Sequence, residues 1–450
     1  MTKTSAEARS PERCLSHYES LPTFSRVQSL EAMKALLELL GNPQDRLRIL
    51  HVAGSNGKGS TCALLEGILQ EGGYATGFYH SPAIPDFLAG IRIGCEPMDL
   101  EGFCAAYPRV MEACDILSRR GLPSPSRFEA FTALAYLVFL EAGVDFAIME
   151  VGLGGTLDAT NVMGKSLLSL ITAISLDHTD ILGNTLEAVA SQKAGILKKG
   201  CPVLLGENPS EVVRTVLARA QALGSPLHDS VPSSDLEVVD ASIHGTTLVC
   251  RHPWYAGAVF TTPLVGVHQR ANIGNALGAA HLLQEMGAAR LPLEVVQKAL
   301  STTVWPGRGE WIRSRGRNFL LDGAHNPQGM AAFQEMLLLP GVPKEKILVL
   351  GILQDKDLSR MLLGLERFFD TVVLTTPESP RAAAPGHLKT LCAGRFPRIH
   401  VEEDPARALE LAAGLVSEQG LVCLAGSLYL VFPCREMLLA KTEGEHDAHL

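Results

Sequence analysis

His51-Val-Ala-Gly-Ser-Asn-Gly-Lys-Gly-Ser60 lies between an apolar run, 47–53, and a helical pattern that continues to Leu69. A glycine-rich turn between a buried strand and a helix lets backbone N–H groups hold phosphate oxygens, and Lys58 can reach a terminal phosphate. The string departs from the standard GxxxxGK(S/T) pattern, because Gly occupies position 59 and Ser60 comes one place later. A glycine turn with an exposed lysine is the alternative. The strand–turn–helix context favours a phosphate loop.

Apolar runs alternate with helical stretches on both sides of this loop, as in parallel α/β folds. After residue 227 the pattern becomes less regular, and Trp305-Pro306-Gly307-Arg308 interrupts it before a second alternation begins. We therefore expect an N-terminal extension with a helix (1–45), an α/β domain (46–303) and a smaller α/β domain (304–450). Two such domains meeting at a cleft suit two substrates. The expected strands are 47–53, 145–151, 167–175, 202–205, 236–239, 246–250, 319–321, 346–350, 371–374 and 421–424, and the expected helices are 128–143, 185–198, 270–287 and 293–302.

The composition excludes several classes of protein. The formal net charge is −9 and aromatic residues make up 6%, which argues against a nucleic-acid partner. A hydrophobic fraction of 46% with 19% charged residues indicates a large buried core. The chain has no apolar run of the length that a membrane helix needs and no signal-peptide pattern at its start, and its ten cysteines form no CxxC pair. We expect a cytoplasmic protein with no membrane partner.

Polar residues follow two further buried strands. Glu150 ends one of them, before Gly-Leu-Gly-Gly155, Asp158 and Asn161, and Asp177-His178-Thr179 follows another. A carboxylate at the carboxyl edge of a parallel sheet points into the ligand crevice, although turn-stabilising acids are common there. A phosphate loop beside a carboxylate and a histidine makes a Mg-nucleotide site plausible.

Ten ordered motifs between residues 51 and 431 resemble those of the folylpolyglutamate synthase / dihydrofolate synthase family within the ATP-dependent Mur ligases. Any one motif is weak, but ten in this order are highly specific. The motifs are HVAGSNGKGS, EVGLGG with DATN, ITAISLDHTDILG, KAGI, GVHQRAN, WPGR, LDGAHNPQ, DKD, SPRA and GSLYLV. The resemblance implies a P-loop-type central domain, a Rossmann-like C-terminal domain and an active site in the cleft between them.

The resemblance also implies the reaction. ATP phosphorylates a carboxylate of a folate or dihydropteroate, and the amine of L-glutamate attacks the acyl phosphate, so that ADP and phosphate leave. The small-molecule substrates would be ATP, L-glutamate and the folate acceptor, and we expect a monomer. The residues expected to bind ATP are Gly54, Ser55, Asn56, Gly57, Lys58, Gly59, Ser60, Asn272, Arg308 and Asp322.

The family pattern further assigns metal ligands and a glutamate site. One Mg²⁺ would lie against Ser81 and Glu150, and a second would be held by Glu150, His178 and Lys193. Lys193 occupies the position of a carbamylated lysine, although a solvated lysine on helix 185–198 is the alternative by itself. His325 and Ser427 would receive glutamate. The expected catalytic residues are Lys58, Lys193, His178, Glu150 and His325, whereas Asp355 and Asp357 are expected to be structural residues or to lie at the rim of the site.

The chain departs from the family on the acceptor side. Ser81-Pro82-Ala83-Ile84 replaces the usual SPHL, and Ala89-Gly90-Ile91 replaces Glu-Arg-Ile, although Arg92 lies two positions beyond the missing arginine. Thr156 stands where many relatives have Arg, and Ser126 replaces a Thr before Phe128-Glu129. The leading hypothesis is a folylpolyglutamate synthase, with or without dihydrofolate synthase activity. The alternatives are a ligase for a different acceptor and a non-catalytic paralogue, against which the complete set of chemical residues counts.

Overall fold

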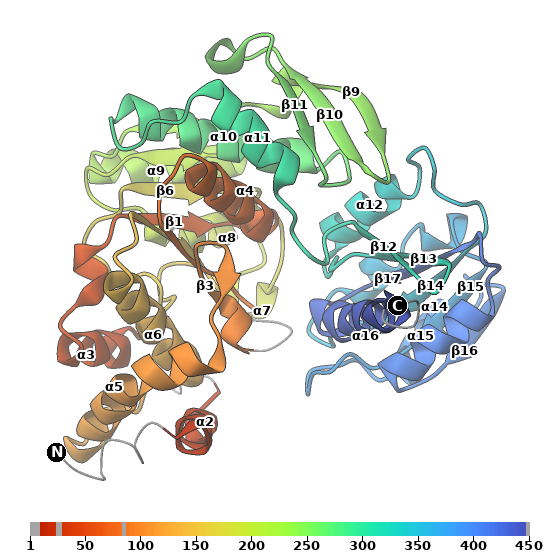
Figure 1. The fold of residues 1–450 in the computed structure, drawn as a ribbon, viewed down its shortest axis with the longest axis horizontal. Helices are drawn as coiled ribbons and strands as arrows, with labels where there is room; N and C mark the ends of the chain where they lie inside the picture. Colours follow the sequence, from red (N-terminus) through yellow and green to blue (C-terminus); the bar gives the residue numbers. More distant parts are fainter. Residues whose placement is uncertain (1–9, 24–28, 83–86, 447–450) are drawn as a thin grey trace. The chain divides into compact units, whose positions relative to one another are not determined.

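The computed structural model describes residues 10–23, 29–82 and 87–446, and Figure 1 shows its helices and strands. The chain forms two compact units. Unit 1 contains Met1–Pro232 and Ala271–Val296, and unit 2 contains Ser233–Arg270 and Gln297–Leu450. The sequence places residues 233–270 in the first domain, whereas the structure groups them with unit 2. The difference arises because this segment builds a separate antiparallel sheet whose strands do not pair with the large sheet of unit 1.

Unit 1 is built on an eight-stranded sheet with the order β4-β3-β2-β5-β1-β6-β7-β8. Strands β2, β5, β1, β6, β7 and β8 are parallel, while β3 and β4 form an antiparallel edge. The four strands expected between residues 47 and 205 are confirmed as β1, β5, β6 and β7. The bounds are β1 Ile49–Ala53, β2 Thr76–Tyr79, β3 Ile91–Ile93, β4 Glu96–Pro97, β5 Phe146–Glu150, β6 Leu168–Ile171, β7 Val203–Leu205 and β8 Leu227–Asp229.

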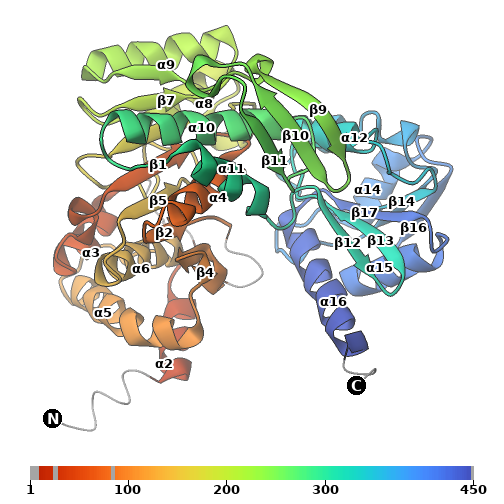
Figure 2. The same cartoon turned by 45° about the horizontal axis from the view of Figure 1, so that its top comes forward.

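Helices cover both faces of this sheet. Ile49, Ala147 and Met149 pack into one cluster with α2, α3, α5 and α6, and Figures 1 and 2 show α4 and α10 on the opposite side of the sheet. Every residue of β1 and β5 is buried, as expected for strands covered on both faces. The bounds are α2 Pro11–Ser20, α3 Glu31–Leu39, α4 Lys58–Glu71, α5 Leu100–Arg119, α6 Arg127–Glu141, α7 Thr179–Leu182, α8 Leu186–Lys193, α9 Ser210–Leu223, α10 Gln269–Glu285 and α11 Leu293–Thr302.

The described part of the N-terminal segment belongs to the core of unit 1. Cys14 on α2 and Met33, Leu36 and Leu37 on α3 are fully buried and pack against α5 and α6. The long helix α5 belongs to the same cluster, although the sequence pattern did not predict this helix. Its apolar positions face this cluster while its other face is exposed. Helices α2 and α3 of this segment therefore contribute to the core of unit 1.

Unit 2 contains a three-stranded antiparallel sheet, β11-β10-β9, and a six-stranded sheet, β12-β13-β17-β14-β15-β16, that is parallel except for β12. Helices α12, α13 and α14 cover one face of the larger sheet, and α15 and α16 cover the other. The strands expected at 319–321, 346–350, 371–374 and 421–424 are confirmed. The bounds are β9 Leu236–Ser242, β10 Gly245–Cys250, β11 Val259–Thr262, β12 Glu310–Ser314, β13 Arg317–Leu321, β14 Lys346–Leu350, β15 Thr371–Leu374, β16 Arg398–Val401, β17 Leu421–Ala425, α12 Pro327–Met336, α13 Leu358–Met361, α14 Pro385–Cys392, α15 Pro405–Gly414 and α16 Leu428–His446.

Candidate active site

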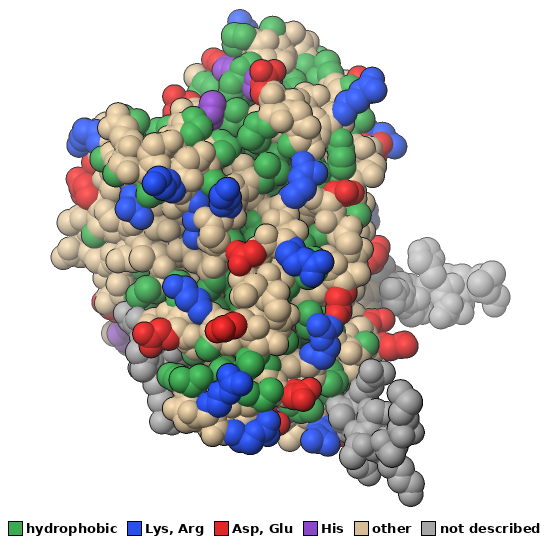
Figure 3. All heavy atoms as spheres, turned by 90° about the vertical axis from the view of Figure 1, so that its left-hand side faces the viewer, with side chains coloured by type: hydrophobic (Ala, Val, Ile, Leu, Met, Phe, Trp, Pro, Cys, Tyr) green, Lys and Arg blue, Asp and Glu red, His purple; other side chains and the backbone are tan. Residues whose placement is uncertain are grey.

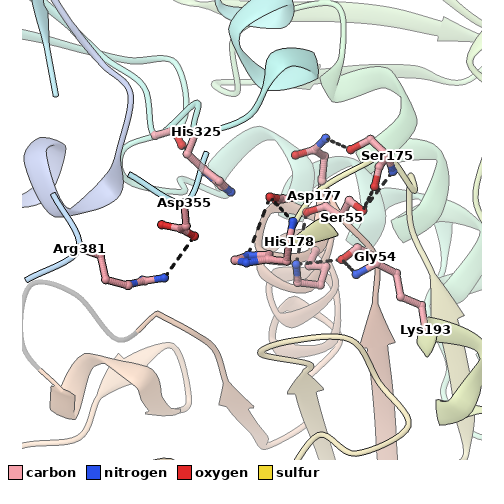
Figure 4. A network of polar contacts seen from close by, with 12 residues as sticks. Gly54, Ser55, Ser175, Asp177, His178, Lys193, His325, Asp355 and Arg381 are labelled. Atoms are coloured by element: carbon pink, nitrogen blue, oxygen red, sulfur yellow. Dashed lines mark hydrogen bonds and ion pairs between the residues drawn. The ribbon is translucent and has the colours of Figure 1, made fainter. Parts of the chain in front are cut away.

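The phosphate loop joins β1 to α4 and is held by the segment that follows β6. The backbone N–H groups of Ser55 and Asn56 donate to the carbonyl oxygen of Ala173, at 2.9 and 3.1 Å. The Ser55 hydroxyl donates to the Ser175 carbonyl oxygen at 2.9 Å and accepts from the Ser175 N–H at 3.1 Å. Figure 4 shows this reciprocal pair beside Gly54. The loop is therefore fixed by hydrogen bonds of the protein itself.

Two glycines of the loop leave no room for a side chain. A Cβ at Gly57, whose φ is +83°, would lie 2.1 Å from Asn272 Oδ1 on α10. A Cβ at Gly54 would lie 1.8 Å from the hydroxyl oxygen of Thr172. The structure thus places Asn272 directly against the loop, as predicted for two nucleotide-binding elements. Thr172 and Ser175 were missed by the sequence reasoning, although both are polar residues in the expected strand 167–175.

Two lysine amines meet at the start of the loop. Lys58 Nζ donates to the Gly54 carbonyl oxygen at 3.0 Å, and Lys193 Nζ donates to the same oxygen at 2.7 Å (Figure 4). Lys193 is 5% exposed. Burial lowers its pKa to about 7, and the charge of Lys58 acts in the same direction, against Asp177 and Asp158. A substantial fraction of the Lys193 amine is therefore neutral at physiological pH.

Lys193 lies at a helix end and not within a longer helix. The sequence predicts a helix over 185–198, but α8 ends at Lys193 and a 3-10 turn, Ala194–Ile196, follows. The turn brings Gly195 against Thr156, where a Cβ would lie 2.1 Å from the threonine hydroxyl oxygen. The end of α8 therefore packs directly against the Gly-Gly turn after β5. A residue larger than glycine at position 195 would clash with Thr156.

The predicted metal ligands lie at the carboxyl edge of neighbouring strands. Glu150 is the last residue of β5, pairs in register with Val52 of β1 and is 5% exposed. Ser81 follows β2, the other neighbour of β5, and its hydroxyl oxygen lies 3.2 Å from the position of a Cβ on Gly152. His178 follows β6 in the left-handed conformation, with its Nε2 3.9 Å from Asp177 Oδ1. Ser81 and His178 thus follow strands of the sheet that carries the phosphate loop, and Glu150 ends another.

No three His, Cys, Asp or Glu side chains come together as a metal site within the described residues. The predicted ligand set contains only two residues of these types, Glu150 and His178, together with a hydroxyl and a lysine. A carbamate on Lys193 would add a carboxylate-like oxygen donor, the kind of ligand that Mg²⁺ prefers. The residues present thus fit a magnesium site if Lys193 is modified.

Asp158 fixes the turn that follows Glu150. Its Oδ2 accepts from the N–H groups of Gly152 and Leu153, and its Oδ1 accepts from the N–H and hydroxyl of Thr160, all at 2.5–3.0 Å. The hydroxyl oxygen of Thr160 lies 2.9 Å from Nε2 of the fully buried His51. Burial raises the pKa of Asp158 despite these hydrogen bonds. The DATN segment therefore positions the Glu150 turn.

In unit 2, Asp322 and Arg308 occupy one corner of the larger sheet. Asp322 follows β13, is 5% exposed and accepts from the N–H groups of Gly309 and Ala324, both at 2.8 Å. Burial raises its pKa to about 6, while Arg308 acts in the opposite direction. Burial lowers the pKa of His268 to about 4, and the charge of Arg308 acts in the same direction. Arg308 and Asp322, which the sequence predicts to bind ATP, thus lie close together.

The two residues predicted for glutamate follow adjacent strands of this sheet. His325 follows β13 and donates through Nδ1 to the Gly323 carbonyl oxygen at 2.7 Å. Ser427 follows β17, is 2% exposed and accepts from the Tyr429 N–H at 3.1 Å. The adjacent strands are joined at this edge by the Asp322 N–H, which donates to the Leu424 carbonyl oxygen. The fold therefore brings His325 and Ser427 to the same carboxyl edge of the larger sheet.

Asp355 and Asp357 have structural partners. Arg381 Nη1 lies 3.5 Å from Asp355 Oδ2, as drawn in Figure 4. Asp357 caps α13 by accepting from the Arg360 N–H at 3.1 Å. These contacts agree with the structural role expected for both residues.

On the acceptor side, Arg92 does not replace the missing arginine of the family motif. Its Nη2 lies 3.0 Å from Oε2 of Glu66, which is 1% exposed, and donates to the Cys95 carbonyl oxygen at 2.8 Å. The guanidinium therefore links the turn between β3 and β4 to α4. Residues 83–86 of the predicted loop 83–91, including Ala83 and Ile84, lie outside the described residues. Ser126 and Glu129 form a capping box at the start of α6.

The comparisons with known proteins agree with this geometry. Residues 307–428 match the model of the Mur ligase glutamate ligase domain. The dihydrofolate synthase/folylpolyglutamate synthase of Bacillus subtilis is 32% identical over 419 residues, covering 92% of this chain and 96% of that protein. The chain belongs to the folylpolyglutamate synthase / dihydrofolate synthase family of Mur ligases. As a member of that family it is an ATP-dependent ligase.

Two further members of the folylpolyglutamate synthase / dihydrofolate synthase family span nearly the whole chain. The folylpolyglutamate synthase of Lacticaseibacillus casei is 33% identical over 430 residues, covering 94% of this chain and 98% of that protein. The structure of Mycobacterium tuberculosis folylpolyglutamate synthase complexed with ADP is 28% identical with a TM-score of 0.85, covering 95% of this chain and 98% of that one. The expected α/β fold is thus confirmed.

The described surface and helices add two observations. On the face shown in Figure 3, Lys and Arg side chains are interspersed with Asp and Glu side chains. Among the described residues, no helix combines the length and the apolar character needed to cross a membrane.

Proposed function

We propose that the chain joins L-glutamate to the carboxylate of a folate or dihydropteroate, with ATP cleaved to ADP and phosphate. The observation that carries the proposal is the meeting of Lys58 and Lys193 at the Gly54 carbonyl oxygen of the phosphate loop, next to the strand that Glu150 ends. Lys58 and the loop N–H groups would stabilise negative charge on a transferring phosphoryl group, which is the main catalytic problem of the reaction, and Lys193 would hold Mg²⁺.

The phosphate loop would bind the terminal phosphates, and Lys58 would exchange its bond to the Gly54 oxygen for a phosphate oxygen. Ser81 and Glu150 would hold one Mg²⁺, and Glu150, His178 and Lys193 a second. Bound Mg²⁺ supplies positive charge that neutralises the phosphate oxygens. Asn272, fixed against Gly57, would orient the nucleotide. The acceptor carboxylate would then attack the terminal phosphate, giving an acyl phosphate and ADP.

Lys193 would act as a carbamate. The lone pair of the neutral amine attacks the carbon of CO₂, so that a C–N bond forms while the electron pair of one C–O π bond moves onto oxygen. The nitrogen then loses a proton to solvent, and the neutral amine becomes an anionic carbamate. Burial supports this step, because it keeps part of the amine neutral and therefore nucleophilic at physiological pH. The nearby Lys58 would stabilise the resulting anion.

Unit 2 would bind the nucleotide and the amino acid. Arg308 and Asp322 would contact ATP, with Asp322 held in place by the Gly309 and Ala324 N–H groups. His325, whose Nδ1 is oriented by the Gly323 carbonyl oxygen, and Ser427 would receive L-glutamate. The substrates would all be small molecules. We propose that the protein acts as a monomer.

A different acceptor is the second candidate. It is favoured by the pairing of Arg92 with Glu66, which leaves the neutral Ala89-Gly90 in place of the acid and base of the family motif. A neutral segment would weaken recognition of charged groups on the acceptor without affecting ATP chemistry.

The test is ADP release with MgATP and L-glutamate, comparing dihydropteroate, tetrahydrofolate and no acceptor. Turnover that requires either acceptor supports the proposal, and the ratio of the two rates separates dihydrofolate synthase from folylpolyglutamate synthase. Absence of turnover with both acceptors, in protein that still binds MgATP, would contradict a folate substrate and favour the second candidate.

A further inference from the structure

The segment Phe87–Ile93, which we call the acceptor-side segment, lies at the same sheet edge as the predicted metal ligands. It contains the 3-10 turn Phe87–Gly90 and β3, and it returns to the sheet where the His80 N–H donates to the Gly90 carbonyl oxygen at 2.9 Å. His80 is followed by Ser81, whose hydroxyl lies against Gly152. Along this edge the order β2-β5-β1 places Glu150 between the acceptor-side segment and the phosphate loop.

Phe87 is held in a socket of aromatic side chains from three helices. Its ring stacks on Tyr18 of α2, with centroids 4.7 Å apart and an interplanar angle of 24°. It meets Phe103 of α5 edge-on at 5.2 Å and Phe131 of α6 at 5.7 Å. Tyr18 itself contacts Phe103 and Tyr107 of α5. The start of the acceptor-side segment is thus fixed by the N-terminal helix as much as by the sheet.

Helix α2 is in turn attached to α5 and α6 by polar contacts. Nδ1 of His17 lies 3.0 Å from the Tyr107 hydroxyl oxygen. The Arg127 side chain donates to the carbonyl oxygens of Glu19 and Leu21, at 2.6 and 3.1 Å. The next residue, Phe128, carries the ring that lies 2.7 Å from the position of a Cβ on Gly152. Helix α2 therefore has a fixed place relative to the turn that follows Glu150.

We propose that Tyr18 is a positioning residue for the acceptor: through its stack on Phe87, helix α2 holds the acceptor-side segment where the acceptor binds. This inference rests on the proposed function, because it assigns the substrate that the segment contacts. ATP contacts the phosphate loop, on the far side of Glu150 from this segment. The effect of Tyr18 is therefore on the acceptor and not on ATP.

The test compares Tyr18→Ala with Tyr18→Phe, which keeps the ring and the stack. Steady-state kinetics with dihydropteroate and tetrahydrofolate should show KM for the acceptor raised about three- to tenfold in Tyr18→Ala, the fold-change that loss of one aromatic pair produces. KM for ATP should stay within twofold, and Tyr18→Phe should match the wild type. If Tyr18→Ala does not yield folded protein, Tyr18→Leu, which fills most of the space without a ring, replaces it.

Amide hydrogen exchange without substrates gives a readout independent of activity. Peptides that cover residues 87–93 should exchange faster in Tyr18→Ala than in Tyr18→Phe, while peptides from the phosphate loop should not change. Unchanged exchange in 87–93, an unchanged acceptor KM, or an equal rise of KM for ATP and acceptor would each overturn the proposal. If the wild type shows no turnover with either acceptor, the proposed function fails, and the exchange result still decides whether Tyr18 positions the segment.

Discussion

Lys58 and Lys193 donate to one backbone oxygen, that of Gly54, at 3.0 and 2.7 Å. The two residues are 135 positions apart in the sequence and come from the start of α4 and the end of α8. Burial disfavours a positive charge on Lys193 and the nearby charge of Lys58 acts in the same direction, so the pKa of Lys193 falls to about 7. Substitution of Lys193 therefore tests the proposed site directly.

Lys193→Ala is expected to lower kcat about a hundredfold or more, the usual effect of removing a group that stabilises transition-state charge. The unfolding temperature should change little, since the amine makes one hydrogen bond to the protein. Short carboxylates added to this variant should restore part of the rate, because they can occupy the place of a carbamate. The exposed Lys199→Ala is the control. Wild-type turnover in Lys193→Ala would remove the carbamate role.

Gly57→Ala is expected to weaken ATP binding and to destabilise unit 1. The added Cβ would lie 2.1 Å from Asn272 Oδ1, and φ of +83° is unfavourable for alanine, so we expect a loss of about 2–4 kcal/mol in free energy of unfolding. Gly73→Ala is a matched control, because Gly73 has φ of +85° and no atom within 4 Å of the added Cβ.

Chemical denaturation measures the free energy of unfolding of Gly57→Ala and of Gly73→Ala. The difference between the two values gives the cost of the clash with Asn272, because both glycines have a similar positive φ. The double variant Gly57→Ala/Asn272→Ala should recover part of the stability, because the clashing amide is absent. Equal destabilisation by Gly57→Ala and Gly73→Ala would show that the close approach of Asn272 to the loop is unimportant.

Asp158→Asn is expected to destabilise the turn after Glu150. The carboxylate accepts four hydrogen bonds, whereas an asparagine amide has one acceptor oxygen, so two buried donors lose their partner. We expect a loss of about 2–4 kcal/mol in the free energy of unfolding and a higher Mg²⁺ concentration at half-maximal rate. Asp145→Asn, at an exposed carboxylate that accepts from the Ala75 N–H, should have little effect. If the Mg²⁺ dependence of the rate did not change in Asp158→Asn, Asp158 would not be needed to position Glu150.

Stability should increase with pH between about 3 and 6.5 partly because of His51. Complete burial lowers the pKa of this histidine from its ordinary 6.5 to about 3, so over this range the unfolded chain binds a proton that the folded protein excludes. The stabilisation is fully present above pH 6.5 and is lost as pH falls toward 3, an effect of roughly 3–5 kcal/mol for this group. His80 and His268, whose pKa values burial lowers to about 4, add in the same direction.

His51→Gln keeps a hydrogen-bonding group near Thr160 but cannot bind the proton. Its free energy of unfolding should therefore change less between pH 6.5 and 4 than that of the wild type, as measured by urea denaturation at each pH. The exposed His244→Gln is the control and should show the wild-type slope. A wild-type slope in His51→Gln would mean that His51 is not excluded from protonation in the folded protein.

Local pattern was enough to place most strands and the phosphate loop. The runs at 346–350 and 371–374 are apolar after their first residue, and β14 and β15 have those same bounds, because strands covered on both faces are apolar over most of their length. The order of the motifs along the chain likewise identified the family. Helix α5 was missed, since its sequence mixes polar and apolar residues with a proline at position 108 and is stabilised by packing on α2 and α6.

The candidate site residues were proposed from the sequence, but their partners in the structure were not. Periodicity and the rule that ligands bind at the carboxyl edge of parallel strands put Lys58, Glu150 and His178 at one edge. Only the tertiary structure brought Lys193 onto the Gly54 oxygen, Asn272 onto Gly57 and Tyr18 onto Phe87, and only it paired Arg92 with the buried Glu66. These relationships join residues far apart in the chain, and they depend on how helices dock on the sheet. Packing and burial decide that docking, and a one-dimensional pattern records which residues prefer to be buried but not which neighbours they meet.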